Sequence, residues 1–85
     1  MNVTMYIKPT CPFCKRAIAL LNQHGLKPTI IDIAADPSKR PEMLQKSRRT
    51  TVPQIFFGDA HIGGCDDLEA LAKNNGLTKY LNGNG

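Results

Sequence analysis

Two changes of hydrophobic period near the start of the chain constrain its fold more than any other feature. Apolar residues alternate with other residue types over positions 2–7, which predicts a strand. Positions 12–24 instead carry apolar residues at helical spacing, with Gly25 as a natural stop, and positions 29–33 are rich in β-branched residues that favour a strand. The predicted buried face of the helix comprises Cys14, Ala17, Ile18 and Leu21. So short a strand–helix–strand unit is expected to form a right-handed parallel crossover.

The rest of the chain predicts two further helices and a hairpin. A helix is expected within residues 38–47, starting so that Pro41 lies in its first turn, because a helix interior would not tolerate this proline. Its core-facing side chains are expected to be Met43 and Leu44. Residues 54–63 predict a β-hairpin that turns at a Gly-Asp pair. A last helix is expected over residues 65–73, and residues 77–81 can add a short helical turn.

These elements follow the order β-α-β-α-β-β-α. We therefore expect an α/β domain in which helices cover both faces of a mixed four-stranded sheet. The 85 residues have room for one such domain, residues 1–85, and residues 82–85 are expected to be a frayed tail. The loop after the first strand then lies at the carboxyl end of that strand, where α/β sheets place their ligands.

Composition and charge narrow the class of protein further. The formal net charge of +4 favours small anionic ligands or acidic partners, while the basic cluster of Lys46, Arg48 and Arg49 lacks the interleaved aromatic residues of a nucleic-acid site. No window approaches the ~18 apolar residues of a membrane span, and the first residues lack the layout of a signal peptide. We therefore expect a cytoplasmic monomer that binds neither nucleic acid nor membranes. His24 and His61 are expected to be exposed, at a helix end and on the hairpin, without a catalytic role.

A redox site is predicted where the first strand gives way to the first helix, at Cys11-Pro12-Phe13-Cys14. Proline suits the first helical position, so Pro12 makes Cys11 the cap residue. The Cys11 sulfur would then face the unpaired amides of the first turn and the positive end of the helix dipole, which favour a thiolate. Nearby positive charge comes from Lys8, Lys15 and Arg16. We expect Cys11 to be the nucleophile, with a lowered pKa, and the more buried Cys14 to be the resolving thiol.

Three other interpretations of the cysteine pair stay open at this point. A C-x-x-C pair is half of a zinc site, but the chain offers only Cys65, His24 and His61 as further ligands and has no second close pair. A structural disulfide over so short a loop would remove little chain entropy. The two cysteines can also be small buried core residues, as free cysteines often are.

Two further motifs follow later in the chain. Thr51-Val52-Pro53 precedes the hairpin and leaves a strand edge that an extended peptide could join, although Pro53 can equally serve only to start a strand. Gly63-Gly64-Cys65-Asp66-Asp67 is a glycine turn that leads into a helix, where bare amides bind a carboxylate and Asp67 can meet an ammonium group. The two aspartates can equally be ordinary capping acids.

The three motifs, in this order within one small domain, resemble the glutaredoxin family, and the resemblance is to bacterial members of its dithiol class. It covers residues 2–81. It implies a thioredoxin-like fold, a cis bond before Pro53, and activity as a glutathione-dependent thiol–disulfide oxidoreductase that reduces protein disulfides and glutathione mixed disulfides. Glutathione would be the electron donor, with no tightly bound cofactor and no metal. The protein partners would contain disulfides or be glutathionylated.

The resemblance also implies a glutathione site. Cys11 would carry the mixed disulfide, and Val52 would pair its backbone with the cysteinyl unit of glutathione. The backbone of Cys65 and the side chain of Asp67 would hold the γ-glutamyl end. Lys8 would attract the glycyl carboxylate; weaker candidates for that role are Arg49 and Gln54. The full set of implied binding residues is Lys8, Cys11, Phe13, Thr51, Val52, Pro53, Gly64, Cys65, Asp66 and Asp67.

Two positions depart from the family pattern. Phe13 stands where many relatives have tyrosine, so a hydroxyl that could hydrogen-bond near Cys11 is lost. Cys65 stands where many relatives have serine, which places a third thiol beside the implied site. Cys65 is then either a buried small residue or a regulatory thiol.

Three rival functions share parts of these observations. A related redoxin reduced directly by thioredoxin reductase would need neither Asp67 nor the glycine turn before it. An iron–sulfur module would bridge a cluster between two subunits through Cys11 and two glutathiones. In the family such binding is associated with other active-site sequences, and Pro12 rigidifies the loop. A basic nucleic-acid binder is allowed by the charge and by nothing else.

Overall fold

Seven regular elements follow one another in the order predicted from the sequence. The computed structural model describes residues 2–74 and 76–77. The elements are β1 (Val3–Ile7), α1 (Pro12–Gln23), β2 (Thr29–Asp32), α2 (Lys39–Ser47), β3 (Gln54–Phe57), β4 (Ala60–Gly63) and α3 (Cys65–Lys73). The predicted turn over residues 77–81 and the predicted tail over residues 82–85 lie, apart from Leu77, outside the described residues. Leu77 itself is buried in the core.

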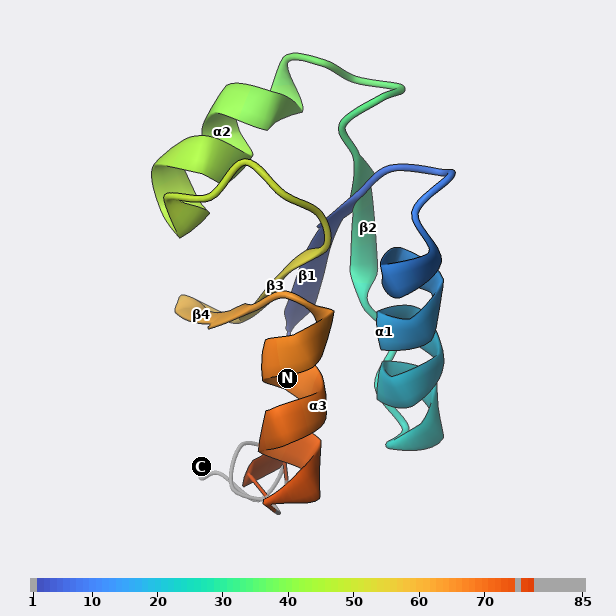
Figure 1. Ribbon diagram of the computed structural model, residues 1–85. Coiled ribbons are helices and arrows are strands. Elements are labelled where there is room, and N and C mark those ends of the chain that lie inside the picture. Colours follow the sequence, from blue (N-terminus) through green and yellow to red (C-terminus); the bar gives the residue numbers. More distant parts are fainter. Residues whose placement is uncertain (1, 75, 78–85) are drawn as a thin grey trace.

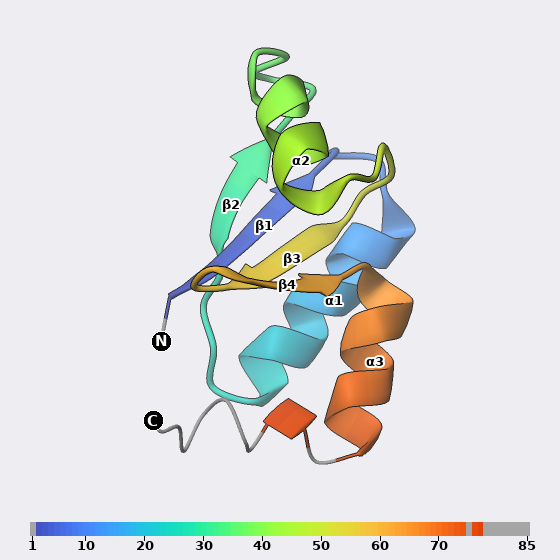
Figure 2. The same ribbon diagram turned by 90° about the vertical axis from the view of Figure 1, so that its left-hand side faces the viewer.

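The four strands form one mixed sheet in the order β2-β1-β3-β4 (Figure 1). β1 runs parallel to β2 and antiparallel to β3, and β4 returns antiparallel to β3. The predicted parallel strand–helix–strand unit and the predicted hairpin are therefore both confirmed. α1 and α3 lie side by side against one face of the sheet, and α2 covers the other face (Figure 2).

The sheet separates two unequal hydrophobic clusters. The larger lies under α1 and α3 and comprises Val3, Met5, Ala17, Leu21, Leu26, Ile55, Phe57, Cys65, Leu68 and Leu77. The smaller lies under α2 and comprises Tyr6, Ile33, Met43 and Phe56. Because both faces are covered, two successive residues of the central strand β1 that point to opposite faces are both buried: Tyr6 is as buried as Met5.

One core prediction is wrong. Met43 is fully buried as expected, but the side chain of Leu44 is 45% exposed. Successive residues point about 100° apart around a helix, and the small cluster beneath α2 receives only a narrow stripe of this helix. Met43 fills that stripe, which leaves Leu44 at its outer edge.

The helix ends follow local sequence signals. Pro12 occupies the first helical position of α1, and Gly25 adopts a positive φ of 78° just beyond its end. Pro41 lies in the first turn of α2, as predicted. Arg48 ends α2 in the left-handed conformation, at φ 60° and ψ 24°, which side chains other than glycine rarely adopt. Within the described part of the chain, no helix has the length and apolar character to cross a membrane.

Candidate active site

Cys11 caps the amino terminus of α1, as its place before Pro12 predicts. Its backbone is extended, and its Sγ accepts a hydrogen bond from the Cys14 amide at 3.3 Å. The Cys11 thiol also donates to the carbonyl oxygen of Val52, 3.7 Å away on the loop before β3. The side chain is half-buried and the first turn of α1 contains no acidic residue. A partly accessible sulfur thus meets an amide at the start of a helix whose first turn has no acidic residue.

Cys14 lies one turn further into α1 and is 1% exposed. Burial, followed by the hydrogen bond with the neighbouring Cys11 sulfur, raises the pKa of Cys14 to about 12. Cys11, Cys14 and Cys65 are all free thiols. The two sulfurs of the pair therefore differ in accessibility, and Cys14 stays protonated at neutral pH.

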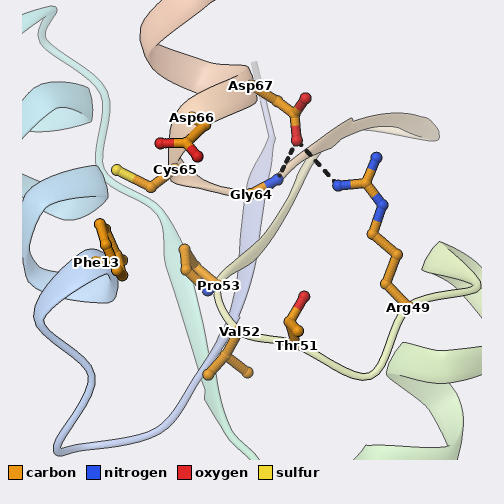
Figure 3. Close-up of a pocket in the computed structure, with 9 residues that line it drawn as sticks. All are labelled: Phe13, Arg49, Thr51, Val52, Pro53, Gly64, Cys65, Asp66 and Asp67. Atoms are coloured by element: carbon orange, nitrogen blue, oxygen red, sulfur yellow. Dashed lines mark hydrogen bonds and ion pairs between the residues drawn. The ribbon is translucent and has the colours of Figure 1, made fainter.

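A pocket of about 210 Å³ is lined in part by Phe13, which lies between the two cysteines in the sequence. Figure 3 shows the residues that line this pocket. Three segments far apart in the sequence form it: the first turn of α1, the loop between α2 and β3, and the start of α3. The residues that line it are Phe13, Arg49, Thr51, Val52, Pro53, Gly64, Cys65, Asp66 and Asp67. Phe13 is half exposed at the rim, with the Arg16 guanidinium 5.8 Å from the centre of its ring.

The buried side chain of Gln54 holds the Thr51-Val52-Pro53 segment by hydrogen bonds to Thr51. The Val52–Pro53 peptide bond is cis, as the family resemblance implied. Gln54, which is fully buried, donates from Nε2 to the Thr51 carbonyl at 3.0 Å and to the Thr51 hydroxyl at 3.3 Å. Its Oε1 lies 2.8 Å from Nε2 of His61 on β4. The expectation that His61 is exposed is wrong, because its ring is half-buried and lies over Phe56 with centroids 4.9 Å apart.

The opposite wall is built around the Asp67 carboxylate at the start of α3. Its Oδ2 accepts a hydrogen bond from the Gly64 amide at 2.9 Å and forms an ion pair with Arg49 Nη1, also at 2.9 Å (Figure 3). The Gly64 amide and then the Arg49 guanidinium hold the pKa of Asp67 below its usual range. Gly63 has φ +118°, and a β-carbon there would lie 2.3 Å from that Oδ2, so only glycine allows this arrangement.

Cys65, the first residue of α3, is 4% exposed and packs into the larger core cluster. Burial, and after it the nearby Glu69 carboxylate, raises the pKa of its thiol. These observations fit the interpretation of Cys65 as a small core residue. A thiol that is both buried and protonated is a poor target for oxidation.

The structure brings most of the predicted site residues together. Of the ten residues that the family resemblance implied, eight line the pocket: Phe13, Thr51, Val52, Pro53, Gly64, Cys65, Asp66 and Asp67. Cys11 reaches the same place through its hydrogen bond to Val52. Lys8 does not line the pocket; its carbonyl accepts a hydrogen bond from the Cys11 amide at 3.3 Å. Arg49, one of the two weaker candidates, is the cation that the pocket contains.

Sequence reasoning missed the partnership of Gln54 with His61. The signal was available, since a glutamine at the start of an apolar strand must find partners when both faces of the sheet are covered. Among the described residues, no three His, Cys, Asp or Glu side chains gather as a metal site requires.

The chain is similar in sequence and in structure to known glutaredoxins. The glutaredoxin family model matches residues 3–62. Glutaredoxin 3 of Escherichia coli strain K12 is 51% identical over 80 residues, covering 94% of this chain and 96% of the relative. The solution structure of glutaredoxin from Brucella melitensis superposes with a TM-score of 0.80 at 47% identity, covering 93% of this chain and 86% of that one. A crystal structure of a buckwheat glutaredoxin–glutathione complex gives a TM-score of 0.87 at 27% identity, covering 95% and 76%.

Proposed function

The chain belongs to the glutaredoxin family of thiol–disulfide oxidoreductases, with its thioredoxin-like fold, and from this premise we propose that glutathione is its reductant and Cys11 its nucleophile. The observation that carries the proposal is the place of the Cys11 sulfur. It caps a helix free of acidic residues in its first turn and touches Val52, a residue of the adjoining pocket. A disulfide held in that pocket would meet the one partly accessible thiol of the pair.

For a glutathionylated substrate the proposed reaction has two exchanges. The Cys11 thiolate attacks the glutathione sulfur, forms a Cys11–glutathione disulfide and releases the substrate as a thiol. The thiolate of a second glutathione then attacks the same glutathione sulfur. Oxidised glutathione leaves, and Cys11 is regenerated as a thiolate.

For a protein disulfide Cys14 takes part. Cys11 attacks one sulfur and forms a mixed disulfide, and Cys14 then attacks the Cys11 sulfur, which releases the reduced protein. Two glutathiones reduce the resulting Cys11–Cys14 disulfide. Because the pKa of Cys14 is raised to about 12, Cys14 stays protonated in the resting pair, which gives the first attack to Cys11.

The chemistry of the pocket supports glutathione as the ligand. Glutathione carries two carboxylates and one ammonium group, and the pocket holds one guanidinium, at Arg49, and two carboxylates, at Asp66 and Asp67. We propose that Asp67 meets the ammonium of the γ-glutamyl end and that Val52 pairs with the cysteinyl backbone. The place of Arg49 in the pocket supports it over Lys8 as the residue that meets a glutathione carboxylate.

The first test is the rate at which the mixed disulfide of glutathione and 2-mercaptoethanol is reduced, as glutathione is varied, with NADPH and glutathione reductase as the readout. A rate that disappears in Cys11→Ser supports the proposal. No rate in the wild type would detach the chain from glutathione, and thioredoxin reductase would then be tested as the electron source.

Cys14→Ser separates the two branches of the mechanism. We expect this variant to keep the reduction of the glutathione mixed disulfide, because only Cys11 takes part in that branch. Reduction of a protein disulfide, followed with insulin as the substrate, is expected to be lost. Equal loss of both activities would refute this division of roles between Cys11 and Cys14.

A further inference from the structure

The fully buried side chain of Gln54 has no role in the exchange reactions above, yet all its polar atoms are engaged. The Thr51 carbonyl can only accept a hydrogen bond, so the group that faces it at 3.0 Å must be the amide nitrogen of Gln54. This fixes the orientation of the amide and leaves Oε1 as an acceptor, 2.8 Å from the His61 ring. Nε2 of His61 must therefore carry the hydrogen that Gln54 accepts.

His61 is held in place for this donation. It stands on β4 opposite Phe56 of β3, and its ring lies over the Phe56 ring at an angle of 33°. The contact limits rotation of the imidazole and keeps Nε2 directed at Gln54. A continuous chain of hydrogen bonds thus runs from the outer strand of the sheet, through the buried amide, to Thr51 in the pocket wall.

The anchored carbonyl of Thr51 fixes the direction of a second group. The Thr51 C=O and the Val52 N–H belong to one trans peptide unit, in which they point in opposite directions. Because the carbonyl points inward to Gln54, the Val52 N–H points away from the buried amide. That N–H has no hydrogen-bond partner within residues 2–74 and 76–77. A free backbone donor on a segment that lines the pocket is ready for a ligand acceptor.

We propose that Gln54 and His61 are positioning residues: they hold the Thr51–Val52 peptide in the one orientation that presents the Val52 N–H to the backbone of bound glutathione. This inference rests on the proposed function, since it needs a peptide ligand in the pocket. Neither residue contacts the ligand. Each acts through the peptide unit that does.

The test compares three variants. Gln54→Met keeps the length and approximate volume of the side chain but removes every hydrogen bond. We expect kcat/KM for the glutathione mixed disulfide to fall about fivefold, the effect of one hydrogen bond of ~1 kcal/mol, with the change in KM rather than kcat. His61→Phe keeps the ring on Phe56 but loses the donor, and a smaller fall of about twofold is expected. His61→Gln retains an N–H donor and is expected to restore the wild-type value.

A second substrate separates positioning from general damage. The aromatic disulfide 5,5′-dithiobis(2-nitrobenzoate) has no peptide group to pair with Val52, so its reaction with Cys11 should change by less than about twofold in all three variants. An equal fall with both disulfides would overturn the proposal, because the substitutions would then act on Cys11 itself. Unchanged kinetics with both would also overturn it.

The proposal can fail separately from the function it rests on. If the wild type does not use glutathione, the position of the Thr51–Val52 peptide can still be tested by NMR of a ¹⁵N-labelled protein. The chemical shift of the Val52 amide must change in His61→Phe and return toward the wild-type value in His61→Gln. No shift overturns the proposal. If Gln54→Met fails to fold, the two variants His61→Phe and His61→Gln test the same proposal. They are expected to fold because His61 is only half-buried on an outer strand.

Discussion

Two helices of this protein have a cysteine at the amino terminus, and the groups around the two cysteines differ. α1 is capped by Cys11, and the half-buried Cys11 sulfur accepts a hydrogen bond from the Cys14 amide. The first turn of α1 contains no acidic residue. α3 begins with Cys65, which is buried, and its first turn contains Asp66 and Asp67. Both termini have backbone amides without a partner inside the helix, and both lie at the positive end of a helix dipole.

The difference shows that a place at a helix terminus does not by itself leave a cysteine accessible from the pocket. In α3 the Gly64 amide donates a hydrogen bond to the Asp67 carboxylate, and the Cys65 side chain packs into the core. The first turn of α1 has no carboxylate that could accept a hydrogen bond from a backbone amide, and the Cys11 sulfur accepts the one from Cys14. One terminus therefore presents a thiol to the pocket, and the other presents a carboxylate and backbone amides.

The largest expected effect separates the two cysteines directly. Cys11→Ser should lower kcat/KM for a glutathione mixed disulfide by at least ~10³-fold, because a serine hydroxyl is a far weaker nucleophile than a thiolate. Cys65→Ser should stay within about threefold, a loss below ~0.7 kcal/mol, since only its backbone would meet the ligand. Initial rates of both purified variants give the comparison. A comparable loss in Cys65→Ser would place the buried thiol in the reaction.

Alkylation measures the same contrast without a substrate. With iodoacetamide at pH 8, Cys11 should be modified first, while Cys14 and Cys65 lag because burial raises the pKa of each. For Cys14, with a pKa of about 12, the thiolate fraction at pH 8 is on the order of 10⁻⁴. Its rate should therefore rise about tenfold for each pH unit up to that value. Mass spectrometry of digested samples identifies the modified residue, and early labelling of Cys65 would contradict its assignment as a core residue.

Asp67, in the first turn of α3, is expected to contribute to glutathione binding. Asp67→Asn keeps an acceptor for the Gly64 amide but removes the charge, so KM for the glutathione mixed disulfide should rise about tenfold with little change in kcat. Asp59→Asn is the matched control: Asp59 is exposed and does not line the pocket, and a change below about twofold is expected. Equal effects would mean that the rates report net charge.

Acidification distinguishes the loss of the Asp67 charge from a general effect of pH. The Gly64 amide and Arg49 hold the pKa of Asp67 below its usual range, so its ionised form persists at pH 5. The stabilisation that these bonds provide is present above the unfolded pKa and disappears only as the pH falls through the lowered folded value. The wild type at pH 5 should therefore not reproduce the KM of Asp67→Asn.

Much of this contrast could be predicted from the sequence because it is local. Pro12 fixes the start of α1 and so the role of Cys11 as its cap, and the glycine turn with its two aspartates marks the start of α3. The fold follows from similarly local signals, since hydrophobic periods define each element. The place of Leu44 could not be predicted, because it depends on how wide a stripe of α2 the small cluster beneath it receives.

The missing parts of the site are contacts between distant residues. Arg49 and Asp67 are eighteen positions apart and meet only after α3 packs beside the loop before β3. His61 reaches Gln54 across a hairpin whose pairing is irregular between Ile55 and Phe56, so the register could not be read from alternation. A local pattern can show that a buried glutamine needs a partner, but it does not show which distant residue supplies it.

The smallest expected effect comes from giving α1 the acid that α3 has. Lys15 is exposed near the first turn of α1, and Lys15→Glu should stabilise this helix by ~0.5 kcal/mol through its dipole. The same charge disfavours a thiolate at Cys11, so alkylation of Cys11 should slow by about two- to threefold at low salt. Lys27→Glu makes the same charge change at an exposed position beyond the other end of α1 and should leave that rate unchanged. Equal slowing in both variants would assign the effect to net charge, and the absence of acids at the start of α1 would then not explain the reactivity that we propose for Cys11.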